Sequence, residues 1–303
     1  MLSYFCNMRL SWKSCSLTLF VLGVCFTLRG QTTRILDSNR DLGRSYTIIW
    51  DSVLYPREEL DHELLRVEYA SLEVDPAFLE GRSEGRWVLQ VGGHCSRFVT
   101  HARFKGDSLF ADNQSKQARI NLRTRKVRGI TLQEAYYVDR STRKLCLTSR
   151  LIGDDYLYEE ELPSIAWRIR DSVKTICGLP CRQAEGDFRG RRYTVFFAED
   201  IPVSYGPWKL QGLPGLILEA YDSEGRIRFV AESIRPSEQM IWRAKYPYIR
   251  ITRKEYEQMV RQMQEQYLVF ANSHISRTNI LQIGLDNTPE PKRRAIAPLE
   301  LEE

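Results

Sequence analysis

Residues 188–218 read Phe-Arg-Gly-Arg-Arg-Tyr-Thr-Val-Phe-Phe-Ala-Glu-Asp-Ile-Pro-Val-Ser-Tyr-Gly-Pro-Trp-Lys-Leu-Gln-Gly-Leu-Pro-Gly-Leu-Ile-Leu. Two β-prone runs flank a loop rich in glycine and proline, and the second run begins at Leu216. The tetrapeptide 213–216 matches a type II turn, because proline fixes φ at its second position and glycine accepts a positive φ at its third. The segment therefore predicts two strands joined by a chain of tight bends.

The first interpretation of this motif is architectural. Glycine and proline stand where the chain must turn, and Trp208 is the expected anchor of the loop. A loop folded over the edge of a sheet explains these residues without any ligand. The motif residues to which we assign a structural role are Gly190, Pro202, Gly206, Pro207, Gly212, Leu213, Pro214, Gly215, Leu216 and Ile217.

A second interpretation makes the rigid loop the rim of a binding site. Its candidate binding residues are Arg189, Arg191, Trp208 and Lys209. The three cations could receive an anionic ligand through charge-assisted hydrogen bonds. Arginines on a strand are also often solvated, or paired with acids such as Glu199. The sequence leaves both interpretations open.

Outside this segment the chain continues with short β-prone runs separated by turns. Strands are expected at 45–55, 64–73, 87–91, 98–101, 134–139, 144–152, 165–170, 192–198, 216–221 and 226–234. The tetrapeptide 222–225 is a good hairpin turn between the last two. The acidic runs 154–155 and 159–161 are interpreted as a solvated turn. Strands and helices do not alternate regularly, which favours an antiparallel sheet.

One amphipathic helix is expected near the C-terminus. Thr252 and Glu255 form a capping box at its start. The apolar residues that share one helical face are Tyr256, Met259, Val260, Met263, Tyr267 and Phe270. The simplest interpretation is a helix packed on the sheet. The predicted fold class is therefore mainly β (α+β): a curved antiparallel sheet, with a half-barrel as one form of it, and a C-terminal amphipathic helix.

The N-terminal residues 1–30 have the pattern of an export signal. Arg9 and Lys13 precede an uncharged, mostly apolar stretch at 14–28, which is shorter than the roughly 20 residues that span a bilayer. Cleavage after residue 30 would leave Gln31 as the new N-terminus. Either Met1 or Met8 could be the start of the chain.

The expected organisation is a signal peptide at 1–30, a single domain at 31–288 and a charged tail at 289–303. The mature chain is expected to have no transmembrane span and to lie in the periplasm or at the outer membrane. A lipoprotein anchor on Cys25 is the less favoured alternative, because Val24 is bulkier than the small residue expected before such a cysteine.

Composition narrows the class of protein. The 303 residues are 43% hydrophobic and 27% charged, which excludes a disordered chain and a polytopic membrane protein. The net charge is +5, but the first thirty residues carry three cations and no acid. The basic balance therefore belongs largely to the N-terminus, and nucleic acid is not an expected partner.

Cleavage of the signal would leave four cysteines, Cys95, Cys146, Cys177 and Cys181. In an exported chain these predict up to two disulfides. Our first expectation is a local Cys177–Cys181 bridge with a separate Cys95–Cys146 bridge. Free buried thiols are the alternative.

No catalytic motif survives inspection. The chain has no H-E-x-x-H, P-loop, G-x-G-x-x-G or G-x-S-x-G pattern. Residues 106–109 read Gly-Asp-Ser-Leu, the name of a serine-hydrolase motif. In those hydrolases the motif follows a buried apolar strand and an Asp-x-x-His pattern occurs later in the chain, and neither feature is present here. His94, Cys95 and His101 are better explained as strand residues than as metal ligands. We therefore expect no catalytic residue, no metal and no cofactor.

The segment 188–218 closely resembles the GLPGLI family of exported proteins from Bacteroidetes-type bacteria, named for the hexapeptide that is 212–217 here. Further matching features are Leu162-Pro163, Trp167, Cys181 with Ala184, and the early strand at 89–98. The resemblance covers roughly residues 45–235. The family has no established function, and its genes often lie near those of TonB-dependent outer-membrane transporters.

The resemblance and the missing catalytic motifs lead to two expectations about function. The first is a non-enzymatic binding or accessory role in the cell envelope, with carriage of a small or lipophilic ligand as one form of it. The alternative is a structural partner that docks on a TonB-dependent transporter or another surface complex and binds no small molecule.

Overall fold

A computed structural model describes residues 26–28, 31–35, 48–50, 56–74, 82–112, 134–151 and 154–265. These residues fall into two units, and each is described by itself. The smaller unit contains the strands β1 (Phe26–Leu28), β2 (Gln31–Ile35) and β3 (Ile48–Trp50), which pair antiparallel in that order. Most of the predicted signal peptide and the tail beyond residue 265 lie outside the described residues, so the domain boundaries stay predictions.

The larger unit holds all other described elements. In chain order they are β4 (Arg57–His62), β5 (Leu65–Val74), β6 (Arg82–Val91), β7 (Cys95–Thr100), α1 (His101–Asp112), β8 (Ala135–Asp139), β9 (Lys144–Leu151), β10 (Asp154–Glu161), β11 (Arg168–Ile176), β12 (Leu179–Phe188), β13 (Arg191–Ala198), β14 (Leu216–Asp222), β15 (Ile227–Pro236), β16 (Met240–Ala244), β17 (Ile249–Arg250) and α2 (Arg253–Glu265).

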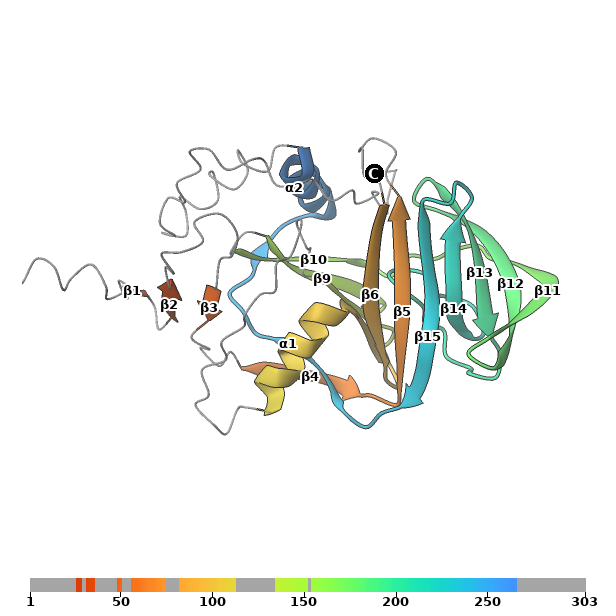
Figure 1. Ribbon diagram of the computed structural model, residues 1–303, viewed down its shortest axis with the longest axis horizontal. Coiled ribbons are helices and arrows are strands. Elements are labelled where there is room, and N and C mark those ends of the chain that lie inside the picture. The colour runs from red at the N-terminus through yellow and green to blue at the C-terminus, as the bar shows by residue number, and fades with distance from the viewer. Residues whose placement is uncertain are drawn as a thin grey trace, which may run out of the picture. The chain divides into compact units, whose positions relative to one another are not determined.

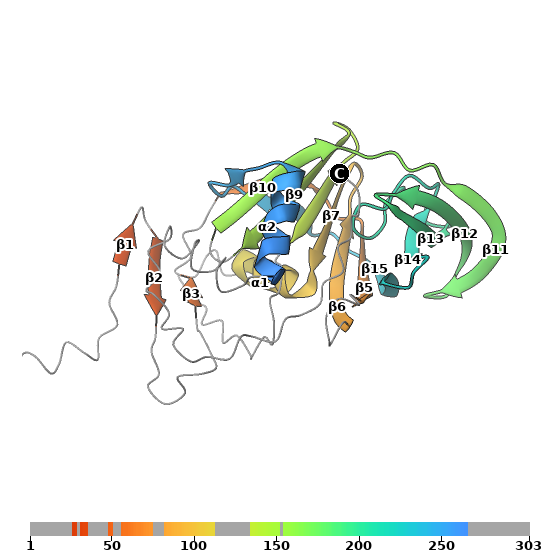
Figure 2. The ribbon, with the colours of Figure 1, turned by 90° about the horizontal axis from the view of Figure 1, so that it is seen from above.

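One curved sheet of twelve strands dominates this unit, in the order β11-β12-β13-β14-β15-β5-β6-β7-β8-β9-β10-β17 (Figures 1 and 2). Every neighbouring pair is antiparallel except β10 with β17, and the sheet is open rather than closed into a barrel. The fold is thus mainly β with two helices among the described residues, which confirms the predicted class. A separate two-stranded ribbon pairs β16 with β4.

Two runs of consecutive antiparallel strands meet in the middle of the sheet. Strands β5 to β10 form one run and β11 to β15 form the other. They join where β15 pairs with β5, from Ile227 opposite Glu73 to Pro236 opposite Leu65. Within each run, a strand pairs with the strand that precedes or follows it in the chain. The β15–β5 ladder joins the two runs into one sheet.

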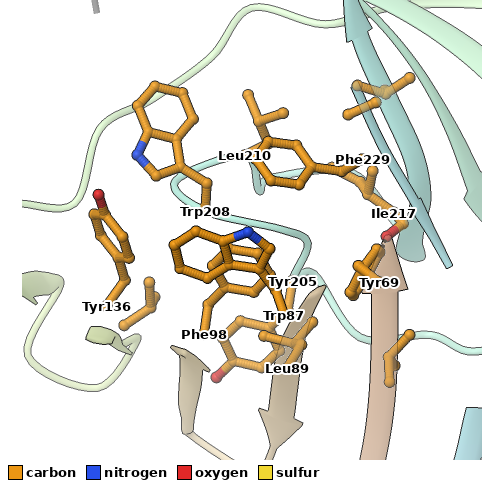
Figure 3. Close-up of a cluster of buried hydrophobic side chains, with 14 of the residues drawn as sticks. Tyr69, Trp87, Leu89, Phe98, Tyr136, Tyr205, Trp208, Leu210, Ile217 and Phe229 are labelled. Atoms are coloured by element: carbon orange, nitrogen blue, oxygen red, sulfur yellow. Dashed lines mark hydrogen bonds between the residues drawn. The ribbon is translucent and has the colours of Figure 1, made fainter. Parts of the chain in front are cut away.

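The face of the sheet that carries Tyr69, Trp87 and Phe98 is called the inner face here. Trp87 stacks on Phe98 with ring centroids 4.7 Å apart, and Tyr69 meets Phe98 edge-on at 6.0 Å. The loop 199–215 lies over these rings, and its apolar side chains point into them (Figure 3). The loop residues buried in this core are Tyr205, Trp208, Leu210 and Leu213.

The opposite, outer face is covered by α1 and by the β4–β16 ribbon. Phe104 of α1 packs with Val88 of β6 and Val99 of β7 in a second apolar cluster. Helix and ribbon therefore shield a side of the sheet that would otherwise expose its apolar positions.

Helix α2 forms where its capping box predicts. The Thr252 hydroxyl accepts the Glu255 N–H at 3.2 Å, and the Glu255 carboxylate accepts the Thr252 N–H at 2.7 Å. Tyr256 and Met263 are buried in the core of the inner face, which confirms a helix packed on the sheet. The predicted apolar positions beyond Glu265 lie outside the described residues.

Some elements differ from the sequence-based expectation. The acidic runs predicted as a solvated turn belong to strand β10, because Tyr156, Leu157 and Tyr158 between them are buried. The strand expected at 98–101 ends at Thr100, where α1 begins. Strands β4, β12, β16 and β17 and helix α1 were not expected, since their residues show no clear apolar period. Of the strand expected at 45–55, only β3 is described.

The expected disulfides are wrong, because all four cysteines are free thiols. Cys95 lies on β7 and Cys146 on β9, with β8 between them. Two strand spacings amount to about 10 Å, whereas a disulfide needs Cα atoms within about 7 Å. Cys177 occupies the turn between β11 and β12, while Cys181 lies further along, opposite Lys174. The hairpin itself therefore holds this second pair apart.

We predict that one of these four thiols reacts in the folded protein. Cys177 is exposed, and the other three thiols are buried. Burial raises the pKa of all four thiols: that of Cys95 to about 12, and those of Cys146 and Cys181 to about 11. A thiol with a raised pKa is less often a thiolate and therefore reacts more slowly. In a chain that starts at Gln31, Ellman's reagent at pH 8 should detect one thiol when the protein is folded and four in denaturant. Cys177→Ser should remove the first signal, and fewer than four thiols in denaturant would contradict the assignment of four free cysteines.

We predict opposite effects for two buried tyrosines. The Tyr69 hydroxyl donates to the Ile217 carbonyl at 2.7 Å, whereas that of Tyr205 is buried with no hydrogen-bond partner among the described residues. Tyr69→Phe should lower the free energy of unfolding by about 1 to 2 kcal/mol, because it leaves a buried carbonyl unsatisfied. Tyr205→Phe should leave stability unchanged or raise it. Urea unfolding measures both, and an equal loss in the two variants would contradict this assignment.

Candidate functional site

The predicted binding residues begin at the turn between β12 and β13. Arg189 and Gly190 both have positive φ, 49° and 73°, as a two-residue hairpin turn of type I′ requires. A depression of about 530 Å³ lies beside this turn. The residues that line it are Asp187, Phe188, Arg189, Gly190, Arg191, Arg192 and Ser223.

The loop 199–215, called the Gly/Pro loop from here on, does not form the predicted type II turn. Gly215 does not have a positive φ, whereas Gly212 has a φ of 102°. Gly215 is required for another reason: a Cβ there would lie 2.2 Å from the carbonyl oxygen of Ala198. Because Leu216 pairs with Ala198, the chain enters β14 pressed against the end of β13.

The other motif residues divide between the surface and the core. Pro202 and Pro214 are exposed on the outside of the loop. Those that the structure buries are Gly206, Pro207, Leu213, Gly215, Leu216 and Ile217. A Cβ on Gly206 would lie 2.6 Å from the Leu210 carbonyl oxygen, so the loop also folds tightly on itself.

Trp208 anchors the loop, as expected. Its side chain is 2% exposed and meets the rings of Phe188 at 5.5 Å and Tyr193 at 6.3 Å. Its φ of 55° is unusual for a bulky residue and costs on the order of 1 kcal/mol or more. The packing of the indole in the core compensates for this backbone strain.

Lys209, the next residue, is fully buried. Its Nζ lies 2.5 Å from Oε1 of Glu160 on β10 and 5.4 Å from the centre of the Tyr158 ring. A buried ammonium group needs a charged partner, because desolvation alone would cost several kcal/mol. Glu160 provides that charge from a distant part of the chain.

Glu160 also binds cations from two other elements. Arg189 donates from Nη2 to its Oε2 at 3.0 Å, and Nε of Arg253 at the start of α2 lies 3.6 Å from the same oxygen. One carboxylate therefore joins the Gly/Pro loop, the β12–β13 turn and α2. We call Glu160, Lys209, Arg189 and Arg253 the Glu160 cluster.

The remaining cations near the turn are paired with acids as well. Arg191 is almost fully buried and donates to Asp222 Oδ2 at 2.7 Å. Asp222 Oδ1 in turn accepts the N–H of Ile227 at 3.0 Å, which closes the β14–β15 hairpin. Exposed Arg192 pairs with Asp187 at 3.0 Å, and this hydrogen bond raises the pKa of the guanidinium.

The structure thus brings Arg189, Trp208 and Lys209 together and holds Arg191 on a separate carboxylate. The predicted cations bind acids of the chain rather than lining an empty anion site. Sequence analysis missed Glu160, since the run 159–161 looked like a solvated turn. The buried Tyr-Leu-Tyr run just before it was the available signal of a strand.

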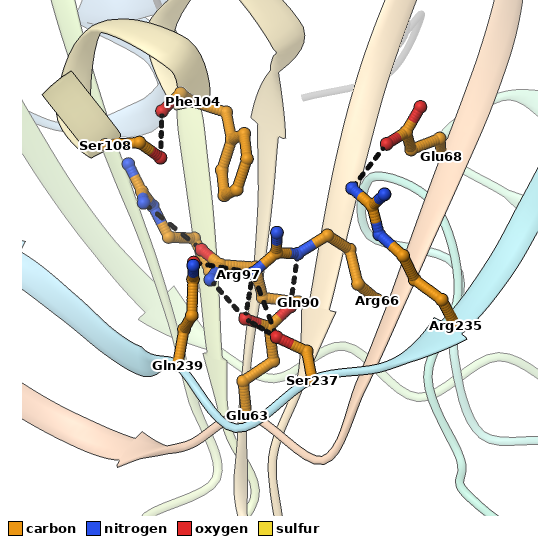
Figure 4. A network of polar contacts seen from close by, with 10 residues as sticks. All are labelled: Glu63, Arg66, Glu68, Gln90, Arg97, Phe104, Ser108, Arg235, Ser237 and Gln239. Atoms are coloured by element: carbon orange, nitrogen blue, oxygen red, sulfur yellow. Dashed lines mark hydrogen bonds and ion pairs between the residues drawn. The ribbon is translucent and has the colours of Figure 1, made fainter.

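A second polar cluster lies on the outer face, near the two connections to the β4–β16 ribbon (Figure 4). Glu63, with no exposed side-chain surface, accepts hydrogen bonds from Arg66 at 2.7 Å, Gln90 at 3.0 Å and Ser237 at 2.9 Å. An open cleft of about 470 Å³ borders it, lined by His62, Glu63, Leu64, Pro236, Ser237 and Glu238. The Glu63 carboxylate oxygens accept hydrogen bonds from within the protein, so this cluster holds the ribbon on the sheet.

Arg97 extends this network beneath α1. Its Nη1 donates to Gln90 Oε1 at 3.2 Å, and its Nη2 forms an ion pair with Asp107 of the helix. Asp107 and Ser108 belong to the Gly-Asp-Ser-Leu run. The Ser108 hydroxyl donates to the Phe104 carbonyl at 2.9 Å inside the helix. The Asp107–Arg97 ion pair thus holds α1 on the sheet, whereas the Ser108 hydrogen bond stays within the helix.

Within the described ranges, no group of three or more His, Cys, Asp or Glu residues is placed to hold a metal ion. None of the helices in the described part of the chain is long and apolar enough to cross a membrane.

Comparisons with known proteins give limited matches. A family model described as "Protein of unknown function (Porph_ging)" matches residues 189–219, which include the β12–β13 turn and the Gly/Pro loop. A comparison with curated proteins found no match.

Two solved structures share part of the backbone course. They are described as "Structure of PNGF-II in P21 space group" and "Structure of PNGF-II in C2 space group". Each is 11% identical over 67% of this chain, with TM-scores of 0.47 and 0.46. The match spans about a third of those chains, 34% and 33%.

The Glu160 cluster generates a prediction about stability. Glu160→Gln leaves the Lys209 ammonium buried without its counter-charge and should lower the free energy of unfolding by about 3 to 5 kcal/mol. Lys209→Met should cost less, because Arg189 and Arg253 still neutralise Glu160. The double variant should be more stable than Glu160→Gln alone, since the fully buried ammonium is gone and the remaining cations, Arg189 and Arg253, are partly exposed to solvent.

Urea unfolding of the three variants measures these differences. Glu159→Gln is the matched control on the same strand, because its ion pair with Arg250 is exposed and should contribute less than about 0.5 kcal/mol. If the double variant lost as much stability as Glu160→Gln, the Lys209 ammonium would not be the group that Glu160 stabilises.

Proposed function

We propose that this protein is an exported, non-enzymatic accessory protein of the cell envelope that acts by docking on another envelope protein. Export is supported by the charge and apolar pattern of residues 1–30. Membership of the GLPGLI family is part of the proposal and is supported by the hexapeptide 212–217. Because genes of that family often lie near those of TonB-dependent outer-membrane transporters, such a transporter is the first partner to test.

The observation that carries this proposal is the filling of the inner face. In a half-barrel carrier, a lipophilic ligand would lie against the aromatic side chains on the concave face of the sheet. Here Tyr205, Trp208 and Leu210 of the loop occupy that position and are buried (Figure 3). The protein's own chain takes the place of a cargo, which favours docking over ligand carriage.

The polar side chains support the same choice. A small anion at the predicted rim would have to displace Glu160 from Lys209 and Arg189. A buried ion pair that has lost one partner is strongly destabilised, so such exchange is unfavourable. Ion pairs that are satisfied inside the protein suit a scaffold that contacts its partner through its outer surface.

The test uses the full chain with a C-terminal affinity tag, expressed in its own host. We expect it in the envelope fraction, with an intact mass that starts at Gln31 and a second protein chain in native mass spectrometry. Arg9→Glu with Lys13→Glu is the control, because it removes the positive charge that precedes the apolar stretch and should block export.

Two results would contradict the proposal. A chain that stays in the cytosol at full length would exclude an envelope role. A native mass that exceeds the chain by a small molecule, and that falls to the chain mass on denaturation, would favour carriage instead.

A further inference from the structure

The two edges of the large sheet differ in length. At one end, β17 contains two residues. At the other, β11 contains nine and pairs only with β12 within the described residues (Figure 1). The outer edge of β11 presents backbone N–H and C=O groups at the periphery of the sheet, which is the usual template for an added strand.

The side chains of β11 are divided by chemistry. Ile169 and Val173 are 41% and 56% exposed, and they pair with Ala184 and Arg182 on one side of β12. Charged side chains occupy the other side. Lys174 forms an ion pair with Glu219, and Arg170 forms one with Glu185 at 2.7 Å. β11 thus presents Ile169 and Val173 on one side and cations on the other, up to the buried Ile176 at its end.

A bulge makes this edge selective. Between the pairs Ile169–Ala184 and Val173–Arg182, β11 has three residues where β12 has one. The regular ladder is therefore restricted mainly to Val173–Ile176. Bulges and charges on an edge strand discourage indiscriminate pairing, so a partner must match both the short ladder and the charges.

We propose that β11 is the docking edge, and that it takes an extended segment of a partner protein in which apolar and acidic residues alternate. This inference rests on the proposed docking function and names the surface for it. The partner's apolar residues would extend the side that carries Ile169 and Val173. Its carboxylates would face the side that carries Arg168, Arg170 and Lys174. Arg170 and Lys174 already pair with acids of this chain, but β11 has three cations against one acid, and opposite charges on neighbouring strands attract.

The charges of β11 favour an acidic segment over a second copy of this chain. Two copies related by a two-fold axis pair the same strand antiparallel. If Ile169 meets Val173 in such a pair, Arg168 faces Lys174 and Asp171 faces its own copy. Both contacts join like charges, which destabilises the pair. An acidic partner strand avoids this repulsion.

The test uses the full chain and a capped nine-residue peptide of alternating valine and glutamate, labelled for fluorescence anisotropy. We expect saturable binding, with slower hydrogen exchange of backbone amides in β11. Val173→Glu should weaken binding at least about tenfold, because it places a carboxylate where the peptide's valines pack. The matched control is Ile249→Glu, which changes an apolar residue of similar exposure, 45%, at the opposite edge and should bind as the unaltered protein does.

Charge reversal tests the acidic requirement. A peptide of alternating valine and lysine should bind the unaltered protein at least about tenfold more weakly, since it faces the cations of β11. Arg168→Glu with Arg170→Glu should restore binding of the lysine peptide and weaken that of the glutamate peptide. Arg250→Glu, on β17, is the control and should change neither.

Three results would overturn this inference. The first is a peptide with the same valines and glutamates in two blocks that binds as tightly as the alternating peptide. The second is slower hydrogen exchange outside β11 when the alternating peptide binds. The third is a dimer of this chain in analytical sedimentation that Val173→Glu dissociates. Failure of the proposed function remains distinguishable. If the host partner travels with the Val173→Glu variant as with the unaltered chain, docking stands and β11 is not its surface.

Discussion

The fully buried ammonium group of Lys209 is the constraint on which this fold depends. A charge in the core is tolerated only when an opposite charge reaches it, and Glu160 supplies that charge from β10. The requirement places the Gly/Pro loop against the N-terminal run of strands, β5 to β10, although the loop itself lies in the C-terminal run. The two halves of the sheet are thus joined by an ion pair on the inner face as well as by the β5–β15 ladder.

Apolar packing and polar pairing act together at this point. Trp208 fixes the loop by filling the core, and its neighbour Lys209 fixes it by charge. Because Arg189 and Arg253 bind the same carboxylate, the β12–β13 turn and α2 are positioned by the same group. In this structure the motif that could form a binding rim connects the Gly/Pro loop, the β12–β13 turn and α2 through one carboxylate.

Sequence patterns correctly predicted the features that depend on residues close together in the chain. The strand at 64–73, the hairpin at 222–225 and the capping box at Thr252 follow from alternation, turn chemistry and capping, and all three are present. Long-range features escaped prediction. Gly215 is needed because of Ala198, Glu160 is buried because of Lys209, and Cys95 cannot reach Cys146 because β8 lies between them. Each depends on which strands become neighbours, and one sequence does not record that.

The β5–β15 ladder has a consequence for the order in which the protein can fold. Paired residues such as Glu73 and Ile227 are more than 150 positions apart in the chain. During synthesis, β5 to β10 can pair while β15 has not yet been made, so one long side of β5 stays open in the meantime. Closing so large a loop is entropically costly and slow. The nascent chain therefore has an unprotected strand in its middle, and the last step of assembly hides it.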